Sequence, residues 1–330
     1  MTEKVSIIIT AHDRKKYLIT AVNSALSQIN LNFSPEIIVV KNYSDEAIDK
    51  YLESKEVKNI YTEEVSFGKK LATGISNATG DCVIFLDDDD LMDPRRAEYI
   101  ISIFNSDKEL IFIHNNILVI TEEGHPIKKQ NIQPRKMNYE IFENSVLDEH
   151  RWSKLLSSRV DWYVSCMSMK RDYAESVNHI IRNSFRSLDK IMFMLSTSGG
   201  KKIALCSNRL TFYRRHESVT GLKTDLETFR KQKLNFTTES IKNIKNTVSS
   251  LGEGLNQIPL NLMIFKMECN EAIYKSGRKV GTVKKGVRCM KYFFKYGGSE
   301  YVNLSFLLLL HNLSPKLSLK LFRYSQTRGL

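Results

Sequence analysis

Blocks of apolar and polar residues alternate along the first hundred positions of this 330-residue chain. Three β-branched apolar runs have the composition of strands that are buried on both faces: 5–10, 36–42 and 81–86. The segments between them predict helices and one shorter strand: 17–29, 45–54, 58–62 and 69–78. Strands that alternate with helices predict parallel pairing through right-handed crossovers, and therefore an α/β sheet.

The rest of the chain divides into a mixed middle and a helical end. The middle predicts one strand or two, a strand followed by a helix, a helix, and a last strand: 110–120, 160–174, 187–200 and 201–216. From Lys223 onwards the sequence is rich in lysine and poor in strand signals, which predicts helices.

Charge is distributed unevenly between these parts. The net charge is +12, and all of the excess lies in residues 223–330, which hold 19 basic and 7 acidic residues. The first 222 residues hold 30 of each sign. Such an asymmetry indicates two regions with different partners. Residues 284–325 fit either an amphipathic surface for anionic lipids or a helical bundle with a solvated basic face.

Neither the cysteines nor the hydropathy point to a zinc site or a membrane span. The five cysteines are scattered without a C-x-x-C pair, which favours reduced thiols over a zinc site. No window holds about 18 uninterrupted apolar residues. Because a strand-like VSIIIT run begins at Val5 without the segments of a secretory signal before it, we expect a cytoplasmic protein.

Four consecutive aspartates in FLDDDDLMDP, residues 85–94, directly follow an apolar run. A solvated acidic loop is one interpretation. A helix N-terminus is another, because Asp93 and Pro94 suit the N-cap and N1 positions, but it leaves the earlier aspartates unexplained. A divalent-metal site is the third, since Mg²⁺ and Mn²⁺ prefer carboxylate oxygens. Alternate residues at a strand end point the same way, so Asp87 and Asp89 can converge on one ion.

Four short motifs occur in an order typical of one enzyme family. The helix after the first strand contains S-x-L-x-Q, and the aspartate run reads L-D-x-D-D-x-x-x-P. Further on, SLDKIMFML carries the acidic residue Asp189 in a helix, and FYRRH contains Y-R-x-H. Over about residues 4–220, this series resembles glycosyltransferase family 2, whose members are inverting enzymes with the GT-A fold.

The resemblance implies a Rossmann-like, mostly parallel sheet flanked by helices, with a helical C-terminal extension. It implies a catalytic domain at 1–222, with a nucleotide-binding half at 1–95 and an acceptor half at 96–222, followed by a basic helical region at 223–330. The implied activity is that of a hexosyl- or N-acetylhexosaminyl-transferase in polysaccharide biosynthesis. Such an enzyme uses Mn²⁺ or Mg²⁺ to hold the diphosphate of a nucleotide-sugar donor, here expected to be a UDP-sugar.

Functional positions of the family transfer residue by residue onto this sequence. Asp189 corresponds to the general base that takes the proton of the acceptor hydroxyl. The implied metal ligands are Asp87, Asp89 and His216. The residues implied to bind the nucleotide-sugar are Thr10, Ala11, His12, Arg14, Asn42, Lys69, Asp87, Asp88 and Arg214.

Several positions depart from the family pattern. Lys41 and Asn42 stand where the second strand usually ends in paired aspartates, the first of which reads the nucleotide base. The amide of Asn42 both donates and accepts, so it can contact the base in place of the missing carboxylate. K-K-L-A-T-G stands where the family has A-R-N, and Leu188 precedes Asp189 where glutamate is common. These departures leave the identity of the nucleotide open.

The acceptor implied by the resemblance is a glycan or a lipid-linked sugar. We expect it at residues 135–185, where Trp152, Trp162 and Tyr163 can either stack on a sugar or fill the core. Many family members act on lipid-linked acceptors, which favours a peripheral position on the inner face of the cell membrane through residues 284–325.

Three other functions stay open. The net charge suggests a nucleic-acid-binding protein, but we find no zinc finger, no RNP-like aromatic motif and no recognition helix, and we expect no nucleic-acid partner. The residues Lys41 and Asn42 suggest a catalytically degenerate family member that acts as a binding or scaffold module. A nucleotidyltransferase also uses metal carboxylates, but the AHDRKK turn lacks the glycines of a phosphate loop.

Overall fold

The chain divides into two compact units. The first comprises Met1–Ser145 and Trp162–Arg215, and the second comprises Val146–Asp161 and His216–Leu330. The computed structural model describes residues 4–13, 15–32, 34–127, 136–197, 201–216, 225–250, 256–275 and 280–328.

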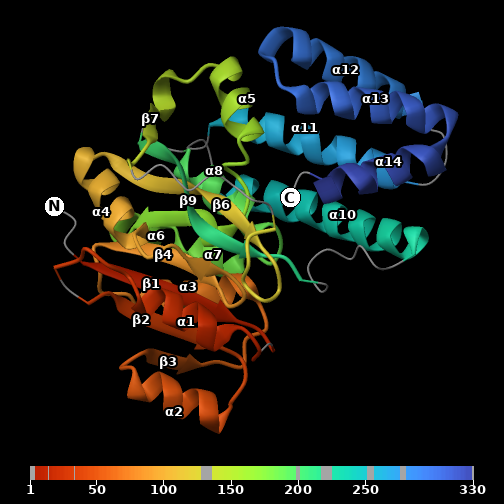
Figure 1. Ribbon diagram of the computed structural model, residues 1–330. Coiled ribbons are helices and arrows are strands. Elements are labelled where there is room, and N and C mark those ends of the chain that lie inside the picture. The colour runs from red at the N-terminus through yellow and green to blue at the C-terminus, as the bar shows by residue number, and fades with distance from the viewer. Residues whose placement is uncertain are drawn as a thin grey trace. The chain divides into compact units, whose positions relative to one another are not determined.

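One mixed sheet forms the centre of the first unit (Figure 1). Its described strands are β1 (Val5–Ala11), β2 (Glu36–Lys41), β3 (Lys58–Tyr61), β4 (Cys82–Asp87), β5 (Leu91–Met92), β6 (Leu110–Ile120), β7 (Tyr139–Glu143), β8 (Met167–Lys170) and β9 (Lys202–Arg214). They lie in the order β3-β2-β1-β4-β8-β6-β9-β5, and β7 also pairs with β9. The α/β class expected from the sequence is confirmed.

Parallel pairing is confined to two parts of this sheet. Strands β3, β2, β1 and β4 are parallel, as are β6 and β9, whereas β8 is antiparallel to both β4 and β6. Strands β5 and β7 are antiparallel to β9. In the parallel part, Thr10 lies opposite Asp87, and Ala11 lies opposite Lys41. The carboxyl ends of β1, β2 and β4 therefore meet at one edge, which is where ligands bind in such sheets.

Helices cover both faces of the parallel strands. The helices of the first unit are α1 (Leu18–Leu26), α2 (Glu46–Ser54), α3 (Phe67–Asn77), α4 (Arg96–Ser106), α6 (Arg171–Ser176), α7 (Asn178–Asn183) and α8 (Leu188–Ser196). Apolar residues of α1, α2 and α4 join one core with alternate β1 residues such as Ile7 and Ile9. On the opposite face α3 packs closely, because a Cβ at Gly74 would lie 2.4 Å from Cγ2 of Ile8.

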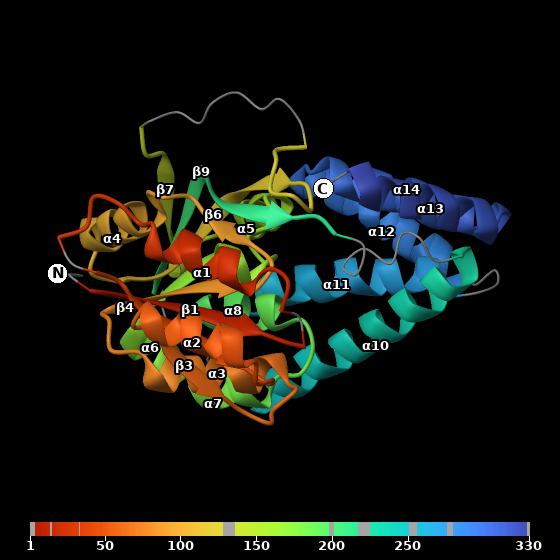
Figure 2. The ribbon, with the colours of Figure 1, turned by 60° about the horizontal axis from the view of Figure 1, so that its bottom comes forward.

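Only helices form the described part of the second unit (Figure 2). They are α5 (Glu149–Ser157), α10 (Leu226–Ser250), α11 (Gln257–Tyr274), α12 (Val280–Tyr296), α13 (Ser299–Leu313) and α14 (Pro315–Arg328). Their core includes Phe229, Phe265, Ile273, Tyr301 and Leu308. Among the residues described, no helix combines the length and the apolar composition needed to cross a bilayer.

Candidate functional site

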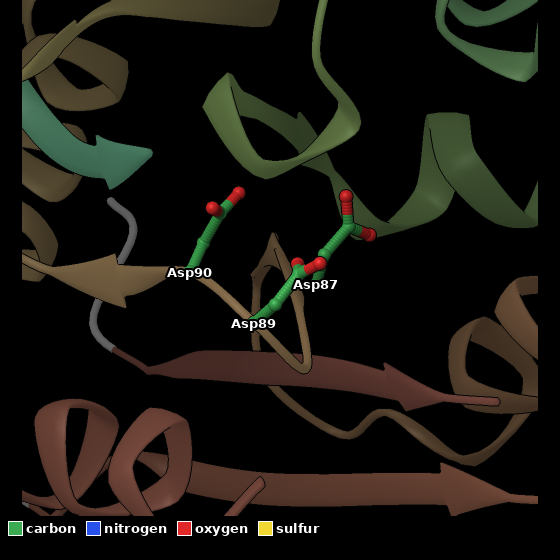
Figure 3. Close-up of side chains that lie close together, drawn as sticks. All are labelled: Asp87, Asp89 and Asp90. Atoms are coloured by element: carbon green, nitrogen blue, oxygen red, sulfur yellow. The ribbon is translucent and has the colours of Figure 1, made fainter. Parts of the chain in front are cut away.

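Three of the aspartates in the run converge where β4 ends. Asp87 is the last residue of β4, and Asp89 and Asp90 lie in the turn before β5. Ligand oxygens of the three carboxylates lie within 4.8 Å of one another (Figure 3). Asp89 is 8% exposed and Asp90 is 2% exposed. Converging carboxylate oxygens are the donor set that Mg²⁺ and Mn²⁺ prefer, so the residues present fit the implied metal.

Arg214 holds the turn that carries these aspartates. Its backbone N–H donates to Oδ1 of Asp90 at 2.9 Å, and its Nε–H donates to the carbonyl of Asp89 at 2.8 Å. From the other side, the N–H of Asp87 donates to Oγ of Ser165 at 2.8 Å. The guanidinium also lies over the ring of Tyr17, 4.8 Å from its centroid. Bonds to β9 and to the segment before β8 therefore fix the turn.

Burial and mutual repulsion shift the acidity of the cluster. Burial, followed by the charges of Asp89 and Asp90, raises the pKa of Asp87 well above its usual value. Burial and the charge of Asp89 raise the pKa of Asp90 to about 7. A carboxylate whose charged form is penalised in this way gains most from a bound cation. The raised pKa values of Asp87 and Asp90 therefore also favour a metal ion at this site.

The sequence analysis did not predict a buried arginine that lies near the carboxylate cluster. Arg96, in the first turn of α4, is fully buried, and its Nη2 donates to the carbonyls of Phe85 and Met167 at 3.3 and 3.4 Å. Burial lowers the pKa of Arg96 to about 10, and the nearby charge of Asp90 opposes that shift. An arginine two residues after Pro94 was the only available signal, and it looked like an ordinary helix-surface residue.

The end of β1 lies beside the aspartates. Oγ1 of Thr10 is buried and has no hydrogen-bond partner among the described residues. The N–H of His12 donates to Oδ2 of Asp88 at 3.4 Å. Asp88 therefore faces the β1 turn, whereas its neighbours form the carboxylate cluster. Arg14, also predicted to bind the nucleotide, lies outside the described residues.

Two neighbouring lysines of α3 have different surroundings. Nζ of Lys69 forms an ion pair with Glu64 at 2.9 Å, and both side chains are partly exposed. Lys70 is 1% exposed, and its Nζ donates to the carbonyl of Ala11 at 2.8 Å and lies 3.0 Å from Nδ1 of His12. Lys69 stays a predicted nucleotide ligand, but Lys70 is the cation that contacts the end of β1.

At the end of β2, a lysine has turned inward. Lys41 is 1% exposed, and its Nζ lies 2.7 Å from Oδ1 of Asp49 and donates to the carbonyl of Tyr43 at 2.7 Å. The side-chain amide of Asn42 makes two hydrogen bonds to Asp13. Nδ2 of Asn42 donates to Oδ1 of Asp13 at 2.9 Å, and the backbone N–H of Asp13 donates to Oδ1 of Asn42 at 3.2 Å. The side chains of Asn42 and Asp13 thus hold the β1 and β2 turns together.

Asp189 lies in the first turn of α8 near a group of aromatic residues. It is partly buried, and its Oδ1 accepts from the N–H of Lys190 at 2.9 Å. Nζ of Lys190 lies 5.3 Å from the ring centroid of Trp162. Tyr163 follows, with its ring centroid 4.6 Å from that of Tyr213, the neighbour of Arg214.

Two further predicted residues belong to the second unit. Trp152 is fully buried in α5, as expected of a core residue. His216 is buried and lies two residues beyond the end of β9. It stays a predicted metal ligand. Asp90, which the sequence analysis did not name as a ligand, lies in the carboxylate cluster with Asp87 and Asp89.

Comparison with known proteins identifies the family. Residues 6–177 match the family described as Glycosyl transferase family 2. An uncharacterised glycosyltransferase of Nostoc sp. is 24% identical over 219 residues, which cover 64% of this chain and 65% of the relative. An uncharacterised glycosyltransferase of Rickettsia bellii is 31% identical over 132 residues, which cover 39% of this chain and 19% of the relative. The chain thus spans less than two thirds of the length of either relative.

Among solved structures, S. aureus TarS 1–349 in complex with UDP-GlcNAc shares the fold. The TM-score is 0.52 at 14% identity, over 99% of this chain and 92% of that chain. This likeness agrees with the GT-A fold and the helical C-terminal region expected from the sequence. Because the family match extends over more than half of its length, the chain belongs to glycosyltransferase family 2.

Proposed function

We propose that this chain is an inverting glycosyltransferase that moves a hexosyl or N-acetylhexosaminyl group from a UDP-sugar to a hydroxyl group. The observation that carries the proposal is the cluster of Asp87, Asp89 and Asp90 at the carboxyl edge of the parallel strands, within the family domain. S. aureus TarS, which shares the fold, was crystallised with UDP-GlcNAc, and this supports a UDP-sugar donor.

Asp87, Asp89 and Asp90 would hold Mn²⁺ or Mg²⁺, with His216 as a further predicted ligand. A bound ion supplies Lewis-acid stabilisation of the negative charge on the leaving diphosphate. Arg214 serves this site by fixing the aspartate turn, because its Nε–H and N–H are both engaged there. Its Nη1 also donates to the carbonyl of Glu122, so the guanidinium serves mainly to hold this turn and has little left to offer a phosphate.

The donor would lie along the ends of β1, β2 and β4. Thr10, Ala11 and His12 border the aspartates, and the buried hydroxyl of Thr10 is available to a ligand oxygen. Lys70 adds a fixed cation at the same turn. The remaining predicted contacts are Arg14, Asn42, Lys69 and Asp88.

Inversion follows from a single displacement at the anomeric carbon. The acceptor oxygen forms the new bond while the bond to the nucleoside diphosphate breaks, and the acceptor proton passes to the carboxylate of Asp189. Asp189 suits this role because its carboxylate is partly buried in the first turn of α8, where Oδ1 accepts from the N–H of Lys190 at 2.9 Å. Trp162 and Tyr163 lie close to this helix and offer faces for an acceptor sugar.

The proposed acceptor is a glycan or a lipid-linked sugar. An acceptor on a lipid would place the protein in the cytoplasm, peripherally on the inner face of the cell membrane. The assignment of residues 1–222 to catalysis and 223–330 to a separate basic region belongs to the same proposal.

A donor panel tests the proposal. Thermal shifts with UDP, GDP, dTDP and CMP sugars, each with and without Mn²⁺, should show stabilisation by UDP-sugars that needs the metal. Asp89→Asn should abolish this stabilisation, whereas Asp172→Asn, whose side chain is 89% exposed on α6, should keep it. Stabilisation that persists in Asp89→Asn, or that ignores the metal, would contradict the metal-dependent mechanism.

A degenerate, binding-only family member is the second candidate. The observation in its favour is Lys41, which fills with a buried ion pair the position where the family has a base-reading acid. Donor binding without release of nucleoside diphosphate, under conditions that support turnover in an active family member, would select this candidate.

A further inference from the structure

Helix α12 exposes an apolar stripe beside a basic one. Phe294 is 79% exposed, and Val283 and Val287 are 40% and 48% exposed. Each of these residues is followed by a cation: Lys284, Arg288 and Lys295. A spacing of four and seven residues aligns each set along the helix axis, so the two stripes run in parallel.

The next two helices also expose apolar residues, and α14 exposes lysines beside them. On α13 the exposed apolar residues are Phe306, Leu309 and Leu313, and Leu313 is 74% exposed. On α14 they are Leu317, Leu321 and Tyr324. Lys316 and Lys320 are exposed on α14, each one position before an exposed leucine.

Contacts between the helices bring these stripes onto one face. Ser305 Oγ donates to the carbonyl of Gly286 at 2.9 Å, and Asn312 Nδ2 donates to Oγ1 of Thr282 at 2.6 Å. These bonds join α12 to one side of α13. On another side, Ser318 Oγ donates to the carbonyl of Leu307 at 2.7 Å, which joins α14. The three helices lie side by side in both ribbon views (Figures 1 and 2).

Helix geometry then places the charges at the edges of this face. At 100° per residue, and with neighbouring helices antiparallel, the exposed apolar stripes of α12, α13 and α14 all face away from the core. The basic stripe of α12 lies on its side remote from α13, and that of α14 lies on its own remote side. We call this face the α12–α14 surface: an apolar centre with a row of cations along each edge.

The charge balance of this surface indicates what covers it. Residues 280–328 contain nine basic residues and one acid, Glu300, which is held by Lys266. Lys284, Lys291, Lys316 and Lys320 have no ion-pair partner within the described ranges. A second copy of the surface would bring like charges together. An apolar band with cationic edges fits the headgroup region of an anionic bilayer, where leucines enter the acyl boundary and lysines meet phosphates.

We propose that the α12–α14 surface docks this protein on anionic lipid bilayers. The apolar stripes from Val283 to Tyr324 enter the interface, and the lysines of α12 and α14 contact lipid phosphates. This docking goes beyond sugar transfer, because it needs neither metal nor nucleotide.

Vesicle flotation of the full chain tests the proposal. Wild type should bind phosphatidylcholine vesicles that contain phosphatidylglycerol, with little binding to phosphatidylcholine alone and weaker binding in high salt. The first variant replaces four lysines with glutamine: Lys284, Lys291, Lys316 and Lys320. The second replaces three apolar residues with serine: Val287, Leu313 and Leu317. Each variant should lower the partition coefficient at least about tenfold.

A matched variant separates the surface from net charge. Four exposed lysines elsewhere are replaced with glutamine: Lys50, Lys55, Lys108 and Lys154. This variant loses the same charge and should stay within about twofold of wild type, because it leaves the apolar band and its edges intact. Circular dichroism melts confirm that all variants are folded.

Three results would overturn the proposal. The first is the absence of binding that depends on phosphatidylglycerol. The second is an equal loss in the matched variant, which would mean attraction by net charge alone. The third is a dimer in light scattering that the serine variant dissociates, which would make the surface an interface between copies. Failure of sugar transfer would leave the vesicle result unaffected, so the two proposals are tested separately.

Discussion

The first unit buries four cations among backbone carbonyls, whereas the lysines Lys284, Lys291, Lys316 and Lys320 of α12 and α14 lie on an open surface. Lys41, Lys70, Arg96 and Arg214 are at most 4% exposed, and each donates to backbone carbonyls. Buried charge is tolerated only when its partners are at fixed positions, so such groups define a rigid site. Exposed lysines pay little desolvation free energy, and their charged groups stay accessible to a large partner such as a bilayer.

The largest expected effect comes from the proposed base. Asp189→Asn keeps the size of the side chain and removes the proton acceptor. We expect kcat for release of nucleoside diphosphate to fall about 10²–10⁴-fold, with donor affinity unchanged. Steady-state kinetics and calorimetric donor titration provide the two readouts. Turnover close to that of wild type would refute the assignment of Asp189, and Asp172→Asn is the control.

Removing a buried cation should destabilise the first unit. Lys41→Met leaves Asp49 without its ion-pair partner, although Asp49 is 34% exposed and water offsets part of the loss. We expect unfolding free energy to fall by about 2–3 kcal/mol, measured by urea denaturation. Asp49→Asn in the same background should recover part of this loss. A Lys41→Met protein as stable as wild type would show that the pair is not structural.

Removing one of the carboxylates that repel each other should instead increase the unfolding free energy. In the unfolded chain the pKa of an aspartate is about 4. Folding raises the pKa of Asp90 to about 7, so the folded state binds the proton more tightly. This group therefore lowers stability as the pH rises between these values.

Asp90→Asn removes this penalty and keeps an oxygen for the N–H of Arg214. We expect the metal-free variant to be on the order of 1–2 kcal/mol more stable than wild type above pH 7, and equal to it near pH 4. Urea denaturation in EDTA at both pH values measures the difference. The same gain at both pH values would rule out titration of Asp90 as its cause.

The smallest expected effect is on the open surface. Lys284 is exposed, and Lys284→Gln should change the unfolding free energy by less than about 0.5 kcal/mol. Urea denaturation of Lys284→Gln and Lys41→Met under the same conditions compares an exposed lysine with a buried one. A loss as large as that of Lys41→Met would show that Lys284 has a structural partner and would weaken the comparison.

Local pattern was enough to predict the main elements and the position of the site. The apolar runs became β1, β2 and β4, and the helical spacing between them became α1, α2 and α3. The aspartate run was expected at a strand end, and Asp87 does end β4. These features depend on residues close in sequence, so periodicity and turn composition carry the information.

The tertiary structure alone decided which groups meet. Alternation along a strand suggested Asp87 and Asp89, but β4 stops at Asp87, and the turn brings in Asp90 while Asp88 faces His12. Lys70 rather than Lys69 contacts the end of β1. The insertion of β8 between β4 and β6, and the place of α5 in the helical unit, likewise depend on packing between distant segments. Such contacts join residues far apart in the chain, and no local pattern encodes them.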